Sequence, residues 1–164
     1  RVQHPDVQLN QQRLSVNQAM IGVIAELEFS AHEKHIDIEL QGEETLAIVA
    51  NPQLLDILLR NLLDNAIKYT PAGGKVIIEI GRDAQKACLA IEDSGPGVAD
   101  EDYLRITQRF YRCVETASTA EGSGLGLSIV QRIIQLHQAD IAFSKSRLGG
   151  VKALLRFQLA VAAG

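Results

Sequence analysis

Two asparagines and a lysine recur in one segment at spacings that place their side chains on a single face of a helix. In the segment 58–69, Asn61, Asn65 and Lys68 follow one another at intervals of four and three residues. At about 100° per residue, these three side chains fall within about 60° of one another. An asparagine carbonyl is an oxygen ligand that suits Mg²⁺, and a lysine ammonium can meet a phosphate as a point charge. The pattern therefore indicates a magnesium and phosphate contact, although a solvated polar face would look the same.

A predicted strand leads directly into a second candidate, Asp93, which is followed closely by glycines. The sequence reads Asp93-Ser94-Gly95-Pro96-Gly97. An acid at this position can accept a hydrogen bond from a ligand that approaches the backbone, and an adenine amino group is one such donor. The same Ser-Gly-Pro-Gly run is also ordinary turn chemistry, so both interpretations remain open.

A third candidate is the glycine-containing segment Gly122-Ser123-Gly124-Leu125-Gly126, which runs directly into a predicted helix. Glycines let the backbone approach a phosphate closely, and the free N–H groups at a helix start favour an anion. The segment is not a dinucleotide-binding fingerprint, because no single strand leads tightly into it and no βαβ unit follows. It also lacks the Gly-Lys-Ser/Thr of a Walker A loop.

The connection between these two glycine segments is too long for an ordinary loop, which predicts a functional lid or a disordered stretch. It contains Arg109-Phe110-Tyr111-Arg112. Two arginines around two aromatic residues could fix a lid against the body of the domain or reach a phosphate. A local hydrophobic anchor would explain them equally well.

Alternating apolar residues predict the strands that must position these groups, and apolar residues at helical spacing predict the helices. Asn17 is a candidate N-cap, and Asn51 followed by a proline is a clear helix start. Such elements favour a two-layer α/β sandwich with helices on one face of a mixed, mostly antiparallel sheet. The predicted strands cover 7–16, 35–40, 46–49, 76–80, 87–91, 141–146 and 151–159, and the predicted helices start after 17 and cover 52–69, 100–106 and 123–137.

The composition fits one domain with an aliphatic core. The chain has 164 residues, 46% of them hydrophobic, with four phenylalanines, three tyrosines and no tryptophan. Its formal net charge is −4, which argues against a nucleic-acid partner. A phosphate ligand must therefore be held by local groups, because the overall field does not attract it.

The order of the four motifs is more specific than any one of them. Asn-x-x-x-Asn-x-x-Lys-Tyr, Asp-x-Gly-x-Gly, Arg-Phe-Tyr-Arg and Gly-x-Gly-x-Gly resemble the N box, first G box, F box and second G box of sensor histidine kinases in the GHKL superfamily. The Arg-Phe-Tyr-Arg run and the stretch from Gly122 to Ile133 look most like the QseC-like membrane kinases. The resemblance covers 7–159 and implies the Bergerat ATP-binding fold, with 1–6 as a residual linker and 160–164 as a tail.

The resemblance also implies a role for each matching residue. Asn65 matches the Mg²⁺ ligand, and Asn61 and Lys68 complete the catalytic set near the metal and phosphates. Asp93 matches the residue that binds adenine. The other implied nucleotide contacts are Tyr69 on the phosphate and sugar side, Gly95 and Gly97 around the pocket, Arg112 on a phosphate, Gly122, Ser123, Gly124 and Gly126 in the phosphate loop, and Leu125 near the base.

Position 61 separates this chain from related ATPases. The gyrase-like, heat-shock-chaperone-like and MutL-like members carry a glutamate general base where this chain has Asn61. An amide cannot take a proton from water, so we expect inefficient ATP hydrolysis. The expected phosphoryl transfer relies on positioning and charge neutralisation instead.

The histidine that such kinases phosphorylate has no counterpart here. A helical acceptor is disfavoured at His4, which precedes a proline. The neighbours of the acceptor motif do not surround His32 or His35, and His137 ends a helix and is expected to be structural or a helix-end cation. We therefore expect the acceptor on a dimerisation domain outside this chain, a response regulator as downstream partner, and a cytoplasmic position in an inner-membrane sensor. A stand-alone regulator such as an anti-sigma-factor serine kinase, and a nucleotide-sensing module without catalysis, remain the alternatives.

Overall fold

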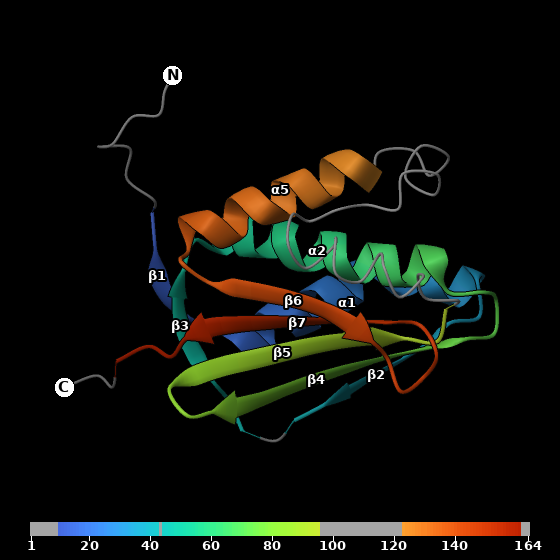
Figure 1. Cartoon of the computed structure of the whole chain (residues 1–164), viewed down its shortest axis with the longest axis horizontal. Helices are drawn as coiled ribbons and strands as arrows, with labels where there is room; N and C mark the ends of the chain where they lie inside the picture. Colours follow the sequence, from blue (N-terminus) through green and yellow to red (C-terminus); the bar gives the residue numbers. More distant parts are fainter. Residues whose placement is uncertain (1–9, 43, 96–122, 162–164) are drawn as a thin grey trace.

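Five strands form the main sheet, and helices cover one of its faces, in the computed structural model, which describes residues 10–42, 44–95 and 123–161 (Figure 1). The strand order is β2-β4-β5-β7-β6. β2 runs parallel to β4, and the other neighbours are antiparallel. The predicted two-layer sandwich with a mixed sheet is confirmed. The strands are β2 Asp37–Gln41, β4 Lys75–Asp83, β5 Lys86–Asp93, β6 Asp140–Lys145 and β7 Val151–Gln158.

A second sheet of two strands lies beside the helices. β1 (Gln12–Ser15) pairs antiparallel with β3 (Ala47–Ala50). The end of the described chain is attached to it, because Ala160 donates its backbone N–H to Ala47 at 2.8 Å and Arg13 donates to the carbonyl of Val161 at 2.6 Å. The strand predicted over 7–16 is therefore present in its second half, and its first residues lie outside the described part of the chain.

Helix α1 (Val16–Glu33) starts one residue before the predicted N-cap, Asn17. Ser15 caps it, since its hydroxyl accepts the backbone N–H of Gln18 at 3.1 Å. The prediction that Asn17 is the cap is wrong. Asn17 instead joins the helix to the chain before β3, accepting from the N–H of Leu46 at 2.9 Å and donating to the carbonyl of Glu44 at 3.1 Å. An amide can satisfy a donor and an acceptor at once, which explains its use there.

Helix α2 (Pro52–Tyr69) lies between α1 and the third described helix, α5 (Ser123–Leu136), and packs against both (Figure 1). The predicted start is confirmed: Asn51 accepts the N–H of Leu54 at 2.9 Å, and Pro52 occupies the first turn. The predicted apolar face is buried too. Its members are Leu55, Leu59, Leu62, Leu63 and Ala66.

The remaining boundaries differ slightly from prediction. β2 begins at Asp37 rather than at His35, because His35 has a φ of 59° in the turn that leads from α1. The helix predicted over 100–106 and the Arg109–Arg112 segment lie outside the described residues. None of the helices that the structure describes is long and apolar enough to cross a membrane.

Candidate nucleotide-binding site

Asp93 is a buried carboxylate at the end of β5, with only 8% of the residue exposed. Its Oδ1 accepts two backbone N–H groups, from Gly95 at 2.9 Å and from Val151 at 3.2 Å. Burial raises the pKa of the Asp93 carboxyl above its ordinary value, and these two hydrogen bonds oppose the rise. Within the described part of the chain, no donor reaches the other oxygen, Oδ2. That oxygen can therefore accept a hydrogen bond from a ligand.

Two glycines beside this carboxylate lie so close to neighbouring atoms that a side chain at either position would collide with them. A Cβ on Gly150 would overlap Asp93 Oδ1 and lie 2.5 Å from its carbonyl oxygen. A Cβ on Gly95 would lie 2.7 Å from the carbonyl oxygen of Tyr69. Contacts this short are not tolerated between real atoms, so both positions require glycine for the close backbone approach rather than for an unusual φ.

The turn between β6 and β7 carries Gly150 and is fixed by a second acid. Glu92 is buried next to Asp93 on the opposite face of the sheet. It accepts from the Ser146 hydroxyl at 3.0 Å and pairs with Arg147 at 3.7 Å. Glu92 therefore holds the turn, while the neighbouring Asp93 faces the helices.

Separate hydrogen bonds fix the end of α2 and the segment that follows Asp93. Thr70, the helix C-cap, is buried, and its hydroxyl donates to the carbonyl of Ala66 at 2.6 Å. The Ser94 hydroxyl accepts the N–H of Lys75 at 2.9 Å, which joins the segment after Asp93 to the start of β4. The C-terminal end of α2, the end of β5 and the start of α5 lie at the same end of the molecule (Figure 1).

The predicted polar face of α2 is present, but its two asparagines differ. Asn61 is half-buried, and its amide nitrogen donates to the carbonyl of Ile57 at 2.7 Å. Asn65 is also half-buried, and within the described residues its side chain has no hydrogen-bond partner. Lys68 is exposed one turn further on, and Tyr69 is half-buried. Asn65 is therefore the amide of this pair that has both its oxygen and its nitrogen available.

The second glycine motif is described only in its backbone. Ser123, Gly124, Leu125 and Gly126 form the first turn of α5, as the sequence predicted for a helix start. Gly97, Arg112 and Gly122 lie outside the described residues. No cluster of three histidine, cysteine, aspartate or glutamate side chains that could hold a metal occurs in the described ranges.

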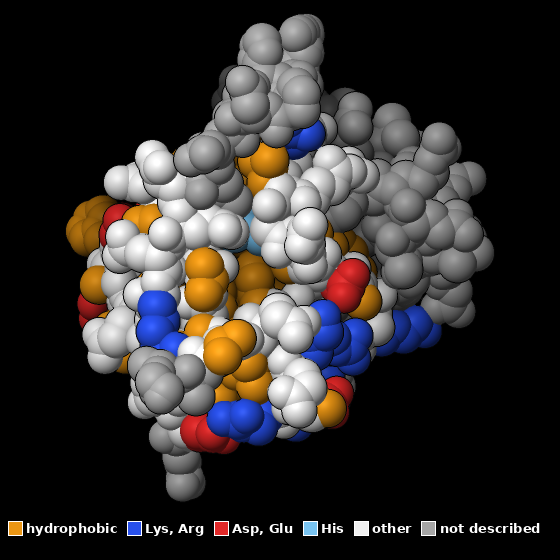
Figure 2. All heavy atoms as spheres, turned by 90° about the vertical axis from the view of Figure 1, so that its left-hand side faces the viewer, with side chains coloured by type: hydrophobic (Ala, Val, Ile, Leu, Met, Phe, Trp, Pro, Cys, Tyr) orange, Lys and Arg blue, Asp and Glu red, His pale blue; other side chains and the backbone are white. Residues whose placement is uncertain are grey.

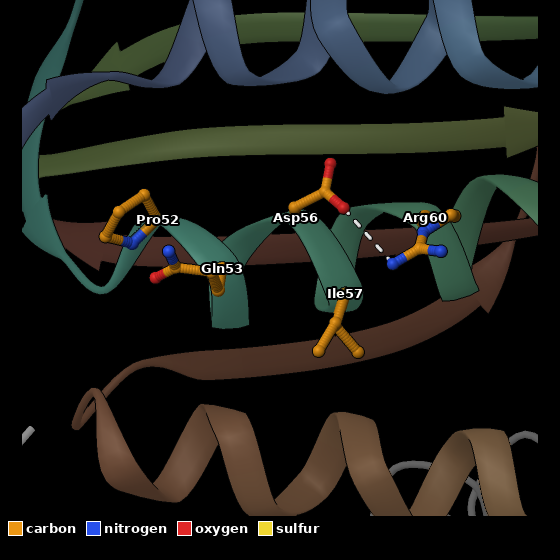
Figure 3. A pocket seen from close by; sticks show the side chains of 5 residues that line it. All are labelled: Pro52, Gln53, Asp56, Ile57 and Arg60. Atoms are coloured by element: carbon orange, nitrogen blue, oxygen red, sulfur yellow. Dashed lines mark ion pairs between the residues drawn. The ribbon is translucent and has the colours of Figure 1, made fainter.

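A hollow of about 400 Å³ on the helical layer involves none of the predicted site residues. It lies over the first half of α2, where Asp56 and Arg60 form an ion pair at 3.2 Å (Figure 3). The end of the molecule opposite the Asp93 site shows hydrophobic side chains in separate spots among polar ones (Figure 2). Neither region presents the convergent polar groups found around Asp93.

Sequence reasoning missed the contribution of β7 to this site. Gly149 and Gly150 precede the strand and read as an ordinary turn, and Gly149 does adopt a positive φ of 107°. Gly150 has no such φ, so its requirement comes from Asp93, which lies 57 positions earlier. Only the pairing of β5 with β7 brings the two together, and a single sequence does not reveal that pairing.

Comparison with known proteins agrees with this geometry. The family model described as histidine kinase-, DNA gyrase B-, and HSP90-like ATPase matches residues 50–161. Sensor protein kinase PmrB of Pseudomonas aeruginosa is 44% identical over 127 residues, covering 77% of this chain and 26% of that protein. Sensor protein QseC of Escherichia coli K12 is 40% identical over 131 residues, covering 79% of this chain and 28% of that protein.

A solved structure extends the likeness to the fold. The catalytic domain of histidine kinase ThkA, in a nucleotide-free form, superposes with a TM-score of 0.79 at 25% identity, covering 92% of this chain and 96% of that one. The chain therefore belongs to the family of histidine kinase-, DNA gyrase B- and HSP90-like ATPases. Within it, the chain is the ATP-binding catalytic domain of a two-component sensor histidine kinase, as the four motifs predicted. It spans about a quarter of the length of these two curated relatives.

Proposed function

We propose that this domain binds Mg-ATP between the end of α2 and the Asp93 loop and donates the γ-phosphoryl group to a histidine on a dimerisation domain. Relay to an aspartate of a response regulator follows, in a protein that is held at the inner membrane by segments outside 7–159. The observation that carries this proposal is the buried Asp93 carboxylate, whose Oδ1 is occupied by backbone donors while Oδ2 has none in the described chain.

Adenine recognition follows from that carboxylate. A buried acceptor left unpaired costs about 1–3 kcal/mol, and a donor from the ligand removes this cost. The exocyclic amino group of adenine is such a donor, whereas guanine presents a carbonyl oxygen at the equivalent position. Gly95 and Gly97 would line the same pocket. We therefore assign the selectivity for the adenine base to Asp93.

The phosphates are assigned to the polar face of α2. Asn65 would supply an amide oxygen for Mg²⁺, and Lys68 and Tyr69, in the last turn, would contact the phosphates and ribose. Mg²⁺, when bound, neutralises charge on the phosphate oxygens during transfer. The first turn of α5 offers N–H groups at Ser123, Gly124 and Gly126 to an anion, with Leu125 near the base. Gly122 and Arg112 complete the proposed phosphate contacts.

Asn61 supports transfer to an acceptor over hydrolysis. Its amide donates to the helix backbone and has no group that can deprotonate water. ATP would therefore persist in the site until an imidazole arrives, because the imidazole is already a nucleophile. The chain's own residues bind and orient the nucleotide and leave the attack to the incoming histidine.

Phosphotransfer tests this proposal directly. The chain is incubated with ATP labelled at the γ position, alone and together with the histidine-bearing dimerisation segment of its own protein. We expect acid-labile label on the added segment and none on this chain. Gln53→Ala, an exposed change in the first turn of α2, serves as a control that keeps activity. Stable label on a histidine of this chain, or on a serine of another partner, would contradict the proposal.

A further inference from the structure

The side chain of Lys34 reaches from the end of α1 to the end of α2. Its ammonium Nζ donates to the carbonyl of Ile67 at 2.9 Å and to the carbonyl of Lys68 at 2.7 Å. Lys34 is itself the C-cap of α1 and is half-buried. One cation therefore holds two of the last carbonyls of the helix whose final turn carries Lys68 and Tyr69.

The carbonyls at the end of α2 affect the electrostatic potential near the proposed phosphate site. The last four carbonyls of a helix lack partners within the helix and give its end a partial negative charge. A triphosphate is strongly anionic, so an uncompensated helix end beside it would repel it. The Thr70 hydroxyl satisfies the carbonyl of Ala66 but adds no charge. The Lys34 ammonium both satisfies the next two carbonyls and offsets the negative end.

The backbone of Lys34 fixes the turn that follows α2. Its carbonyl accepts the N–H of Gly73 at 3.2 Å, and the carbonyl of Gly74 accepts the N–H of Asp37 at 3.0 Å. This turn leads into Lys75, which contacts Ser94 in the segment after Asp93. Side chain and backbone of Lys34 thus attach α1 to both ends of the turn beside the candidate site.

We propose that Lys34 is a positioning residue for the nucleotide phosphates. It holds the last turn of α2 so that Lys68 and Tyr69 face the phosphates, and it cancels the negative helix end without touching the ligand. The proposal rests on the proposed function of α2 in binding Mg-ATP. It assigns Lys34 a stronger effect on ligands that carry phosphates than on adenosine, which requires the Asp93 side alone.

The test compares Lys34→Met with wild type, using calorimetric titration for Mg-ATP and NMR titration for adenosine at a temperature where both proteins are folded. Methionine keeps the apolar stem and removes the charge. We expect Mg-ATP to bind roughly tenfold more weakly, in line with a charge at a helix end, while adenosine binding stays within about twofold. Lys34→Arg, which can donate to both carbonyls, restores Mg-ATP binding. Lys86→Met, at the far end of β5, is the matched control and binds both ligands like wild type.

A second variant protects the test against a folding defect. Lys34→Gln can still donate one hydrogen bond to the helix end but has no charge, and we expect an intermediate loss confined to Mg-ATP. Equal losses for Mg-ATP and adenosine, or a lower melting temperature with unchanged affinities, would overturn the proposal and leave Lys34 a stabilising residue only. Lys68→Ala distinguishes a failure of the Lys34 proposal from a failure of the proposed function. If it weakens Mg-ATP binding while Lys34→Met does not, the role of Lys34 fails and the proposed function stands; if wild type itself prefers adenosine to Mg-ATP, both fail.

Discussion

The backbone N–H of Val151 donates to the Oδ1 of Asp93 at 3.2 Å, although the two residues are 58 positions apart. Together with the bond from Gly95, this contact fixes which carboxylate oxygen faces the backbone and which is left for a ligand. Two main-chain donors, rather than neighbouring side chains, therefore set the orientation of the Asp93 carboxylate.

Asp93→Asn should abolish tight ATP binding without unfolding the domain. The two backbone donors would hold the amide oxygen in the place of Oδ1, so the amide NH₂ would occupy the place of Oδ2. A donor would then face the adenine amino group, and we expect a loss of roughly 30-fold or more. Calorimetric titration measures it, and an affinity within threefold of wild type would contradict the assignment.

The same substitution should change how stability depends on pH. Burial raises the pKa of Asp93 in the folded state, so its contribution to stability is fully present below the unfolded pKa and is lost as pH rises through the folded pKa. The asparagine variant does not suffer this loss. We expect its free energy of unfolding, relative to wild type, to rise between pH 3 and 7 in urea titrations. A difference that falls over this range would mean that Asp93 is stabilised as a carboxylate.

Gly150→Ala should damage both stability and binding, because the new methyl group would overlap Asp93 Oδ1. Overpacking of this kind costs about 1–3 kcal/mol, and moving Asp93 would also weaken ATP binding. Gly22→Ala is the matched control, since nothing lies within 4 Å of its added Cβ in α1. It should stabilise by about 0.5–1 kcal/mol. Thermal melts of both variants test this prediction. Equal melting temperatures would refute the close approach of Gly150 to Asp93.

His137 should matter for stability alone. Its Nε2 accepts the backbone N–H of Asn51 at 3.1 Å, and its Nδ1 lies 2.8 Å from the carbonyl of Ile133. Both contacts fit the structural role that was predicted from the sequence. His137→Leu leaves the Asn51 donor unpaired and should cost about 1–2 kcal/mol. ATP affinity, measured by titration, should not change, because this contact joins the first residues of α2 to the end of α5.

Most of the architecture could be predicted from local patterns. Residues close together in the sequence are enough to predict the cap at Asn51, the buried face of α2 and the alternation in β4, β5 and β7. The N-cap prediction for Asn17 was wrong because an amide that joins a helix to a neighbouring segment and an amide that caps a helix look alike in sequence. Gly150 and Lys34 were not found because their meaning depends on partners brought near by the fold, the carboxylate of Asp93 and the end of α2.

Calorimetric titration of ATP into wild type and Asn65→Ala, each with and without Mg²⁺, tests the central claim most directly. Wild type should bind ATP and gain at least tenfold in affinity when Mg²⁺ is added. Asn65→Ala should keep its Mg²⁺-free affinity within about twofold and lose most of that gain, since only the metal contact is removed. An identical Mg²⁺ dependence in both proteins, or no ATP binding by wild type, would contradict the account.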